Sequence, residues 1–148
     1  MHHRPDIKLR PLGPDAEDVR HSMVTKAGED TGLVLTGEEL GAAIDIDGRL
    51  LLFVVYGDPY EDSLEIALAD AAFALLDSAT LGAMGATGTL ADVALTPPAT
   101  VRFTFFAGRP WRVTIHSRAR TVLPFPTLGY GLARPFTWRR WFDVGPDG

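Results

Sequence analysis

The 148-residue sequence contains no cysteine, which excludes disulfide bonds, thiolate metal sites and cysteine nucleophiles. It also lacks a long apolar run, since the longest, residues 50–56, is far shorter than the roughly 18 residues that a membrane-spanning helix needs. The N-terminal MHHRPDIKLRP has no apolar stretch after its positive charges, unlike a secretory signal. We therefore expect a cytoplasmic protein that does not enter a membrane.

Motifs of high specificity for catalysis or ligand binding are also missing. The glycine-rich stretch 82–88 superficially resembles a phosphate-binding loop, but it follows a predicted helix and precedes a predicted strand, whereas such loops follow a strand and open a helix. No G-x-S-x-G sequence marks a nucleophilic serine. We accordingly expect no cofactor, no metal and no catalytic residue, and we favour a protein that is not an enzyme.

The composition is that of one ordinary globular domain. Hydrophobic residues make up 46% and charged residues 22% of the chain, close to the averages of soluble proteins. A chain of this length buries roughly 70% of the surface that its unfolded form exposes. We expect a single domain over residues 1–148, with a flexible N-terminus at 1–14 and a loop-rich C-terminal segment at 119–148 that wraps the domain.

Charge is divided unevenly along the chain. Residues 1–98 carry 6 Lys and Arg against 17 Asp and Glu, whereas residues 99–148 carry 8 Arg against 2 Asp. All positive charges of the second part are arginines, whose planar fork suits carboxylate, phosphate and aromatic partners. Either the two parts neutralise each other within one fold, or the basic part forms a surface for a partner.

The clearest structural signal is a β-hairpin. Residues 42–46 alternate apolar and polar, Asp47-Gly48 suits a type I′ turn, and residues 49–56 run apolar. Because the second strand is apolar at every position, both of its faces need cover, and it belongs in the middle of a sheet. A helix covers one face, and the other meets a second layer, the inside of a barrel or another subunit.

Helical patterns are predicted on both sides of this hairpin. Residues 58–79 have apolar side chains at three- and four-residue spacing, preceded by the cap-like Asp58-Pro59 and by Glu61. Residues 15–26 form a shorter and weaker helix prediction after Pro14-Asp15. The first of these helices is expected to pack deeply, because its later half is apolar almost all round.

A second hairpin is predicted from alternation at 101–106 and 111–118, with shorter strands at 33–36 and 89–95. Its inward residues are expected to be Val101, Phe103, Phe105, Trp111, Val113 and Ile115, and its outward residues Arg102, Thr104, Arg112, Thr114, His116 and Arg118. The predicted fold class is α+β: an antiparallel sheet of about six strands, built from two hairpins with one long helix between them.

The outer face of the second hairpin is the first candidate site. Arg102, Arg112, His116 and Arg118, with Arg120 nearby, lie within a few strand spacings and are able to hold a phosphate, a carboxylate or an acidic surface. Alternatively, the sheet simply shows polar side chains to water. His116 is also a candidate general acid or base, but no carboxylate that would orient it lies nearby in sequence.

The second candidate site is PFTWRRWFDVG at 135–145. As a helix it places Trp138, Trp141 and Phe142 on one face; as a strand it places Phe136, Trp138, Arg140 and Phe142 on one face and Arg139 and Trp141 on the other. In either case most of the aromatic area is expected to cover the sheet. Arg139, Arg140 and the tryptophan left exposed, Trp138 or Trp141, are the residues expected to contact a partner.

These observations favour a non-catalytic protein-binding or assembly module, such as an immunity-type inhibitor, a chaperone or a structural subunit, acting through an Arg/Trp surface. Its partner is another protein or a second copy of itself. The alternative is a small-molecule-binding enzyme with a pocket between helix and sheet. A third hypothesis, nucleic-acid binding by the basic C-terminal part, is disfavoured because the acidic remainder repels a polyanion and no recognition motif is present.

Overall fold

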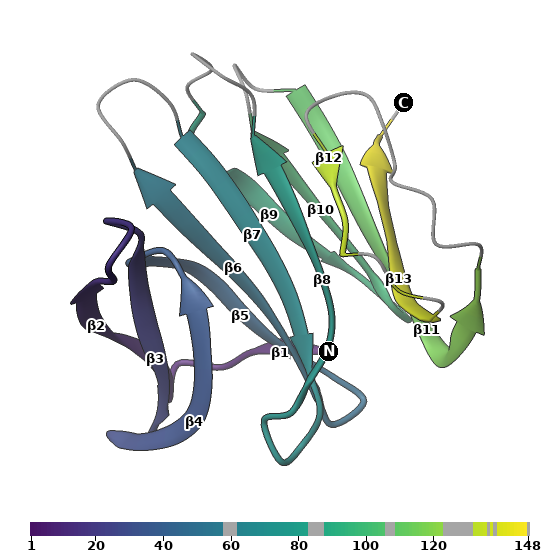
Figure 1. Cartoon of the computed structure of the whole chain (residues 1–148). Coiled ribbons are helices and arrows are strands. Elements are labelled where there is room, and N and C mark those ends of the chain that lie inside the picture. The colour runs from purple at the N-terminus through teal and green to yellow at the C-terminus, as the bar shows by residue number, and fades with distance from the viewer. Residues whose placement is uncertain are drawn as a thin grey trace.

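The computed structural model describes residues 1–57, 62–82, 88–105, 109–122, 132–135, 137 and 139–147, and all of its regular structure is β. No described residue lies in a helix, so the predicted α+β class is wrong: the fold is all-β, with three antiparallel sheets (Figure 1). A search of this described part finds no helix that would cross a membrane.

Three sheets contain the strands. The six-stranded sheet has the order β1 (His2–His3), β5 (Glu39–Ile46), β6 (Arg49–Gly57), β7 (Asp62–Ala69), β8 (Leu75–Gly82), β12 (Leu132–Ala133). The four-stranded sheet has the order β13 (Arg139–Pro146), β11 (Arg109–Thr121), β10 (Thr100–Phe105), β9 (Ala91–Thr96). The three-stranded sheet has the order β2 (Ile7–Pro14), β3 (Arg20–Lys26), β4 (Glu29–Thr36). Residues 1–14, expected to be flexible, thus include β1 and β2.

The six-stranded sheet is the middle layer of three (Figure 1). One of its faces packs against the four-stranded sheet, with Phe53 and Phe103 in edge-to-face contact at 5.1 Å between ring centroids. Its other face packs against Val24 and Leu35 of the three-stranded sheet. The molecule therefore has two hydrophobic cores, one on either side of the central sheet.

Strand β6 confirms the prediction that an all-apolar strand lies mid-sheet with both faces covered. It pairs with β5 and β7, and its side chains alternate between the two cores. Leu51 and Phe53 enter the core shared with the four-stranded sheet, while Leu52 and Val54 enter the core shared with the three-stranded sheet. Both layers come from this chain, so β6 gives no reason to expect another subunit.

The hairpin between β5 and β6 is confirmed, together with its turn. Asp47 and Gly48 have φ angles of 53° and 79°, and two consecutive positive values are what a type I′ turn requires. The Asp45 carboxylate accepts a hydrogen bond from the Gly48 N–H at 3.3 Å. The turn therefore explains why aspartates are found at positions 45 and 47.

The long helix predicted at 58–79 is wrong where the structure describes it, because residues 62–82 form the hairpin of β7 and β8; Asp58, Pro59 and Glu61 lie outside the described residues. Leu64, Ile66 and Leu68 repeat with period two and share one face. A segment that is apolar on all sides suits a central strand as well as a buried helix, and the alanine content favoured the helix only by local propensity. Packing between the two neighbouring layers stabilises the strand conformation of this segment.

Aspartates that resemble helix caps make turns instead. At 15–26 the predicted helix is wrong, since β3 begins at Arg20 and the Asp15 carboxylate accepts hydrogen bonds from the N–H groups of Glu17 and Val19 at 2.8 and 3.0 Å. Asp70 does the same for Ala72 and Ala74 between β7 and β8. A short carboxylate near free backbone N–H groups suits a helix start and a turn equally.

The second hairpin is confirmed as β10 and β11, and the strand predicted at 89–95 is confirmed as β9. The six side chains expected to point inward are all buried. The last strand, β13, pairs with β11 and completes the four-stranded sheet. The described C-terminal residues therefore add a strand to this sheet, whereas residues 123–131 of the predicted wrap lie outside the described part.

A buried ion pair connects the central sheet to β13. Asp77 of β8 accepts hydrogen bonds from the Arg134 guanidinium at 2.7 Å and from the Trp141 N–H at 2.8 Å. The exposed fractions of the Asp77 and Arg134 side chains are 1% and 5%. Arg134 also donates to the carbonyl oxygens of Ser78 and Phe142, so it links β8 and β13 a second time. Burial lowers the pKa of Arg134, and the Asp77 carboxylate opposes that shift.

Replacing Asp77 by alanine should lower the free energy of unfolding by about 3–5 kcal/mol, because the Arg134 guanidinium then stays buried without its counter-charge. Urea unfolding measures this loss. The matched control is Asp30→Ala, which removes the carboxylate from an exposed pair with Arg10. Water screens that pair, so the control should lose much less stability. Equal losses for both variants would contradict a special role for the buried pair.

A half-buried carboxylate, that of Glu65, lies on the opposite face of the central sheet. The Glu65 side chain of β7 accepts a hydrogen bond from the Thr36 N–H at 3.1 Å, and burial raises the pKa of this carboxyl group. The folded protein therefore takes up this proton at a higher pH than the unfolded chain does. The charged form costs stability at neutral pH, and the cost disappears as pH falls through the raised pKa.

The variant Glu65→Gln should consequently be more stable than the wild type at about pH 7, because it removes the buried charge and keeps an oxygen for the Thr36 N–H. The difference should shrink as the pH falls toward about 4, near the ordinary range of glutamate. Thermal unfolding over this pH range provides the measurement, with Glu39→Gln at an exposed position of β5 as control. A Glu65→Gln variant that is destabilised equally at every pH would show that the carboxylate is needed for packing alone.

Candidate functional site

The two candidate sites of the sequence lie on one sheet. Arg112, His116 and Arg118 belong to β11, which pairs on one side with β10, the strand of Arg102. On its other side β11 pairs with β13, which carries Arg139, Arg140 and Trp141. Trp138 lies outside the described residues. The pairing of β11 with β13 thus brings together the two candidate sites, the one on the second hairpin and the one in the C-terminal segment.

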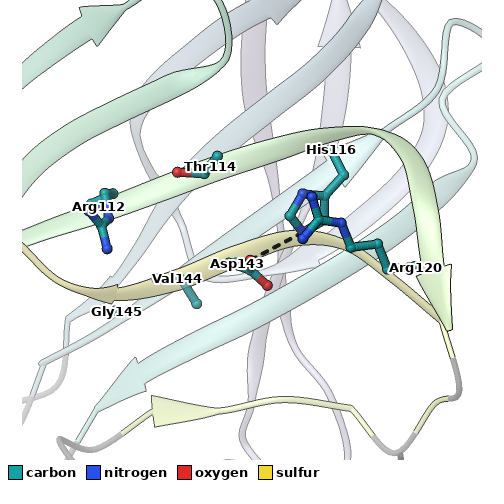
Figure 2. Close-up of a pocket in the computed structure, with 7 residues that line it drawn as sticks. All are labelled: Arg112, Thr114, His116, Arg120, Asp143, Val144 and Gly145. Atoms are coloured by element: carbon teal, nitrogen blue, oxygen red, sulfur yellow. Dashed lines mark ion pairs between the residues drawn. The ribbon is translucent and has the colours of Figure 1, made fainter. Parts of the chain in front are cut away.

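A hollow of about 280 Å³ opens on this sheet between β11 and β13 (Figure 2). Three basic residues line it together with one acidic, one hydroxyl and two non-polar residues: Arg112, His116, Arg120, Asp143, Thr114, Val144 and Gly145. Figure 2 shows Arg112 at one end of the group and His116 with Arg120 at the other. The enzyme alternative placed a pocket between a helix and a sheet, and this location is wrong, since the hollow lies on strands.

His116 lies on the outer side of the four-stranded sheet, as alternation predicted, because Arg112, Thr114 and His116 line the same hollow. Unlike Arg112 it is buried, with 6% exposure. The pairing of β11 with β13 becomes irregular between Ile115 and Arg120, and the His116 carbonyl oxygen accepts a hydrogen bond from Arg49 at 2.7 Å. Alternation gives the side of the sheet on which a residue lies, but not how deeply it is buried.

The structure supplies the carboxylate that the sequence did not place near His116. The Nε2 atom of His116 lies 3.3 Å from Oδ2 of Asp143, an ion-pair distance, but the two atoms are not aligned as a hydrogen bond. The side chains differ greatly in exposure, 5% for His116 and 70% for Asp143. Asp143 is recognised as a neighbour of His116 only from the strand register, in which Asp143 lies opposite Thr114.

Four arginines of β11 and β13 are exposed and form no ion pair with any described residue: Arg112, Arg118, Arg120 and Arg139. We refer to these four residues as the arginine face, although only Arg112 and Arg120 are placed together, in the same hollow. Arg102 differs, because it bonds the Asp147 carboxylate and the Thr96 hydroxyl, both at 2.9 Å. The other sheets also pair their arginines, for example Arg4 with Asp6 and Arg10 with Asp30.

The expectation that Arg140 lies at the surface needs correction, whereas the expectation for Trp138 concerns a residue outside the described part. Segment 139–146 is a strand, which is one of the two predicted alternatives. Arg140 is buried, and its guanidinium donates a hydrogen bond to the Pro135 carbonyl oxygen at 2.9 Å. Trp141 is half-buried against the core, and the Arg49 guanidinium lies 5.8 Å from its ring centroid. Among the described residues of β13, the exposed ones are Arg139 and Asp143, and Trp141 is not among them.

A second hollow, of about 440 Å³, adjoins the first through the shared residues Thr114, His116 and Arg120. It extends to the turn between β5 and β6, where Asp47 and Arg49 line it. Together the two hollows run from the outer side of the four-stranded sheet to the edge of the central sheet.

The chemistry of the site suits an anion. Arginine forks bind carboxylate and phosphate oxygens through paired N–H groups, and the histidine and the threonine hydroxyl add further donors. His116 with Asp143 is also the pair of groups needed for proton transfer. Among the described residues, no group of three or more His, Asp or Glu side chains is placed to hold a metal ion.

In comparisons with protein-family models, curated proteins and solved structures, nothing matches this chain. Its function is therefore inferred from the geometry and charge of its own residues.

Proposed function

We propose that this chain is a non-catalytic protein-binding module that holds an acidic partner protein on the arginine face. The observation that carries the proposal is the contrast between paired and unpaired arginines. The exposed arginines of the three-stranded sheet, Arg10 and Arg20, have carboxylate partners in the chain, whereas Arg112, Arg118, Arg120 and Arg139 have none among the described residues. An acidic surface would supply the missing charges.

The setting of the arginine face favours specific contact over general attraction. The chain as a whole is acidic, with a formal net charge of -5, so a patch of positive charge selects one orientation of an acidic partner. Arg112, Arg120 and Arg139 lie at paired positions of β11 and β13, which hold their backbones in place. Arginine is also enriched at interfaces because its fork forms several directed hydrogen bonds.

A foreign protein fits this proposal better than a second copy of the chain. The apolar strand β6 had suggested self-association, but both of its faces are covered within the chain. The remaining argument for self-association is charge, since residues 1–98 carry 17 acidic side chains. Light scattering of the purified chain at low salt separates the two cases, because self-association raises the mass with concentration.

An acid–base enzyme is the second candidate, favoured by the pairing of His116 with Asp143 in a polar hollow. Two features count against it. The Asp143 carboxylate makes no hydrogen bond to Nε2 of His116, so it does not hold the imidazole in a fixed orientation as the carboxylate partner of a catalytic histidine does. The hollow also lacks an apolar wall that would exclude water from a reaction, which active sites commonly provide.

The double variant Arg112→Gln/Arg120→Gln should bind an acidic peptide at least about tenfold more weakly than the wild type, because two direct charge contacts are lost. Fluorescence anisotropy with labelled hexaglutamate at low ionic strength measures the affinity. The charge-matched control is Lys8→Gln/Lys26→Gln, which removes two exposed positive charges from the three-stranded sheet. This control should change the affinity by less than about twofold, since screening weakens charges at a distance.

Two results would overturn the proposal. One is hexaglutamate binding that both double variants weaken equally, which would reduce the interaction to net charge. The other is tight binding of a single-stranded oligothymidine with no binding of hexaglutamate, which would favour the nucleic-acid hypothesis.

A further inference from the structure

We propose that the hollow beside His116 is a subsite for one carboxylate group of the acidic partner, and that Asp143 occupies this subsite in the free protein as an internal competitor. This inference rests on the proposed function and names the point at which the partner is held. It assigns Asp143 a role opposite to that of a catalytic carboxylate, because its removal is expected to improve binding.

The first argument is the unsatisfied histidine. The Nε2 atom of His116 is buried and has no hydrogen-bond partner among the described residues. Buried polar atoms are nearly always hydrogen-bonded, and one that is not costs free energy. The nearest carboxylate, that of Asp143, lies at 3.3 Å but is not aligned for a hydrogen bond. A carboxylate that aligns better with Nε2 would recover this cost.

The second argument is that Asp143 is free to leave. Its side chain is 70% exposed and belongs to β13, which lies at the edge of the four-stranded sheet. No hydrogen bond to its carboxylate is found in the described part of the chain, so moving the side chain into water breaks the ion-pair contact with His116 and weakens a longer-range attraction to Arg134, which Asp77 still pairs. The backbone of β13 need not move, because the N–H groups of Trp141 and Phe142 are held by Asp77.

The third argument is the arrangement around the histidine. Arg112 and Arg120 line the same hollow, and the Thr114 hydroxyl lies between them on β11 (Figure 2). Once Asp143 turns away, the hollow presents two guanidinium groups and an imidazole to an incoming carboxylate. Such a group of donors favours a carboxylate through charge and through paired hydrogen bonds.

The fourth argument is the room around the subsite. A single carboxylate fits the hollow of about 280 Å³, and the adjoining hollow of about 440 Å³ shares His116 and Arg120 with it. The chain that carries the carboxylate is thereby able to continue past the histidine toward Arg49. An acidic side chain on an extended segment of a partner protein matches this shape.

The variant Asp143→Asn tests this inference directly, because it removes the competing charge at an exposed position and keeps the size of the side chain. It should bind labelled hexaglutamate about fivefold more tightly than the wild type, as expected for the loss of one repulsive charge next to the ligand. The matched control is Asp92→Asn on β9, an exposed aspartate of the same sheet that lines neither hollow. Its positive φ angle of 53° is one that asparagine tolerates, so the control should fold normally.

The control should bind within about twofold of the wild type, because its charge lies outside the subsite. Hexaglutamine should bind neither the wild type nor Asp143→Asn, since it carries no carboxylate on its side chains. A second readout is the NMR signal of the His116 ring, which should shift when hexaglutamate is added to either protein.

The outcomes separate this inference from the proposed function. If hexaglutamate binds the wild type, but Asp143→Asn improves binding no more than Asp92→Asn, the arginine face stands and the subsite is wrong. A weaker affinity of Asp143→Asn would also overturn the subsite, since the carboxylate would then support binding. If hexaglutamate binds neither the wild type nor Asp143→Asn, both proposals fail.

Discussion

The position of the last strand depends on one buried carboxylate, that of Asp77. It accepts hydrogen bonds from Arg134 and from the Trp141 N–H, and so joins the central sheet to β13. An ion pair this deeply buried repays the cost of losing water only when its hydrogen bonds are well formed, as they are here. Apolar contacts between the layers supply most of the stability, but they do not specify where along β8 the strand β13 lies. The hydrogen bonds that Asp77 accepts specify this position.

The candidate site follows from this position. With β13 fixed against β11, Asp143 comes opposite Thr114 and beside His116 in the hollow of the four-stranded sheet. Arg49 of the central sheet donates a hydrogen bond to the His116 carbonyl oxygen and so supports this part of β11 from the other layer. The arginine face is a separate feature built on the same two strands. Structural charges of this region are paired and buried, whereas the charges proposed for binding are exposed and unpaired among the described residues.

Much of the β structure was predictable, because alternation and turn chemistry are local properties. The apolar run of β6 and the Asp47-Gly48 turn gave a central hairpin, and the inward residues of β10 and β11 were identified correctly. The helix predictions failed because Leu64, Ile66 and Leu68 fit either period in an apolar segment, and only packing between layers decides. The site was predictable as a set of arginines on β11. The burial of His116 depends on packing between layers, and the approach of Asp143 depends on the register of β13 against β11, neither of which a local pattern encodes.

The central claim is that β11 and β13 form the binding surface for an acidic partner, and amide chemical-shift mapping with unlabelled hexaglutamate tests it most directly. The account predicts that the largest shifts fall within Arg109–Thr121 and Arg139–Pro146, with little change in the three-stranded sheet. Shifts concentrated on β2, β3 and β4, or spread evenly over the molecule, would contradict it.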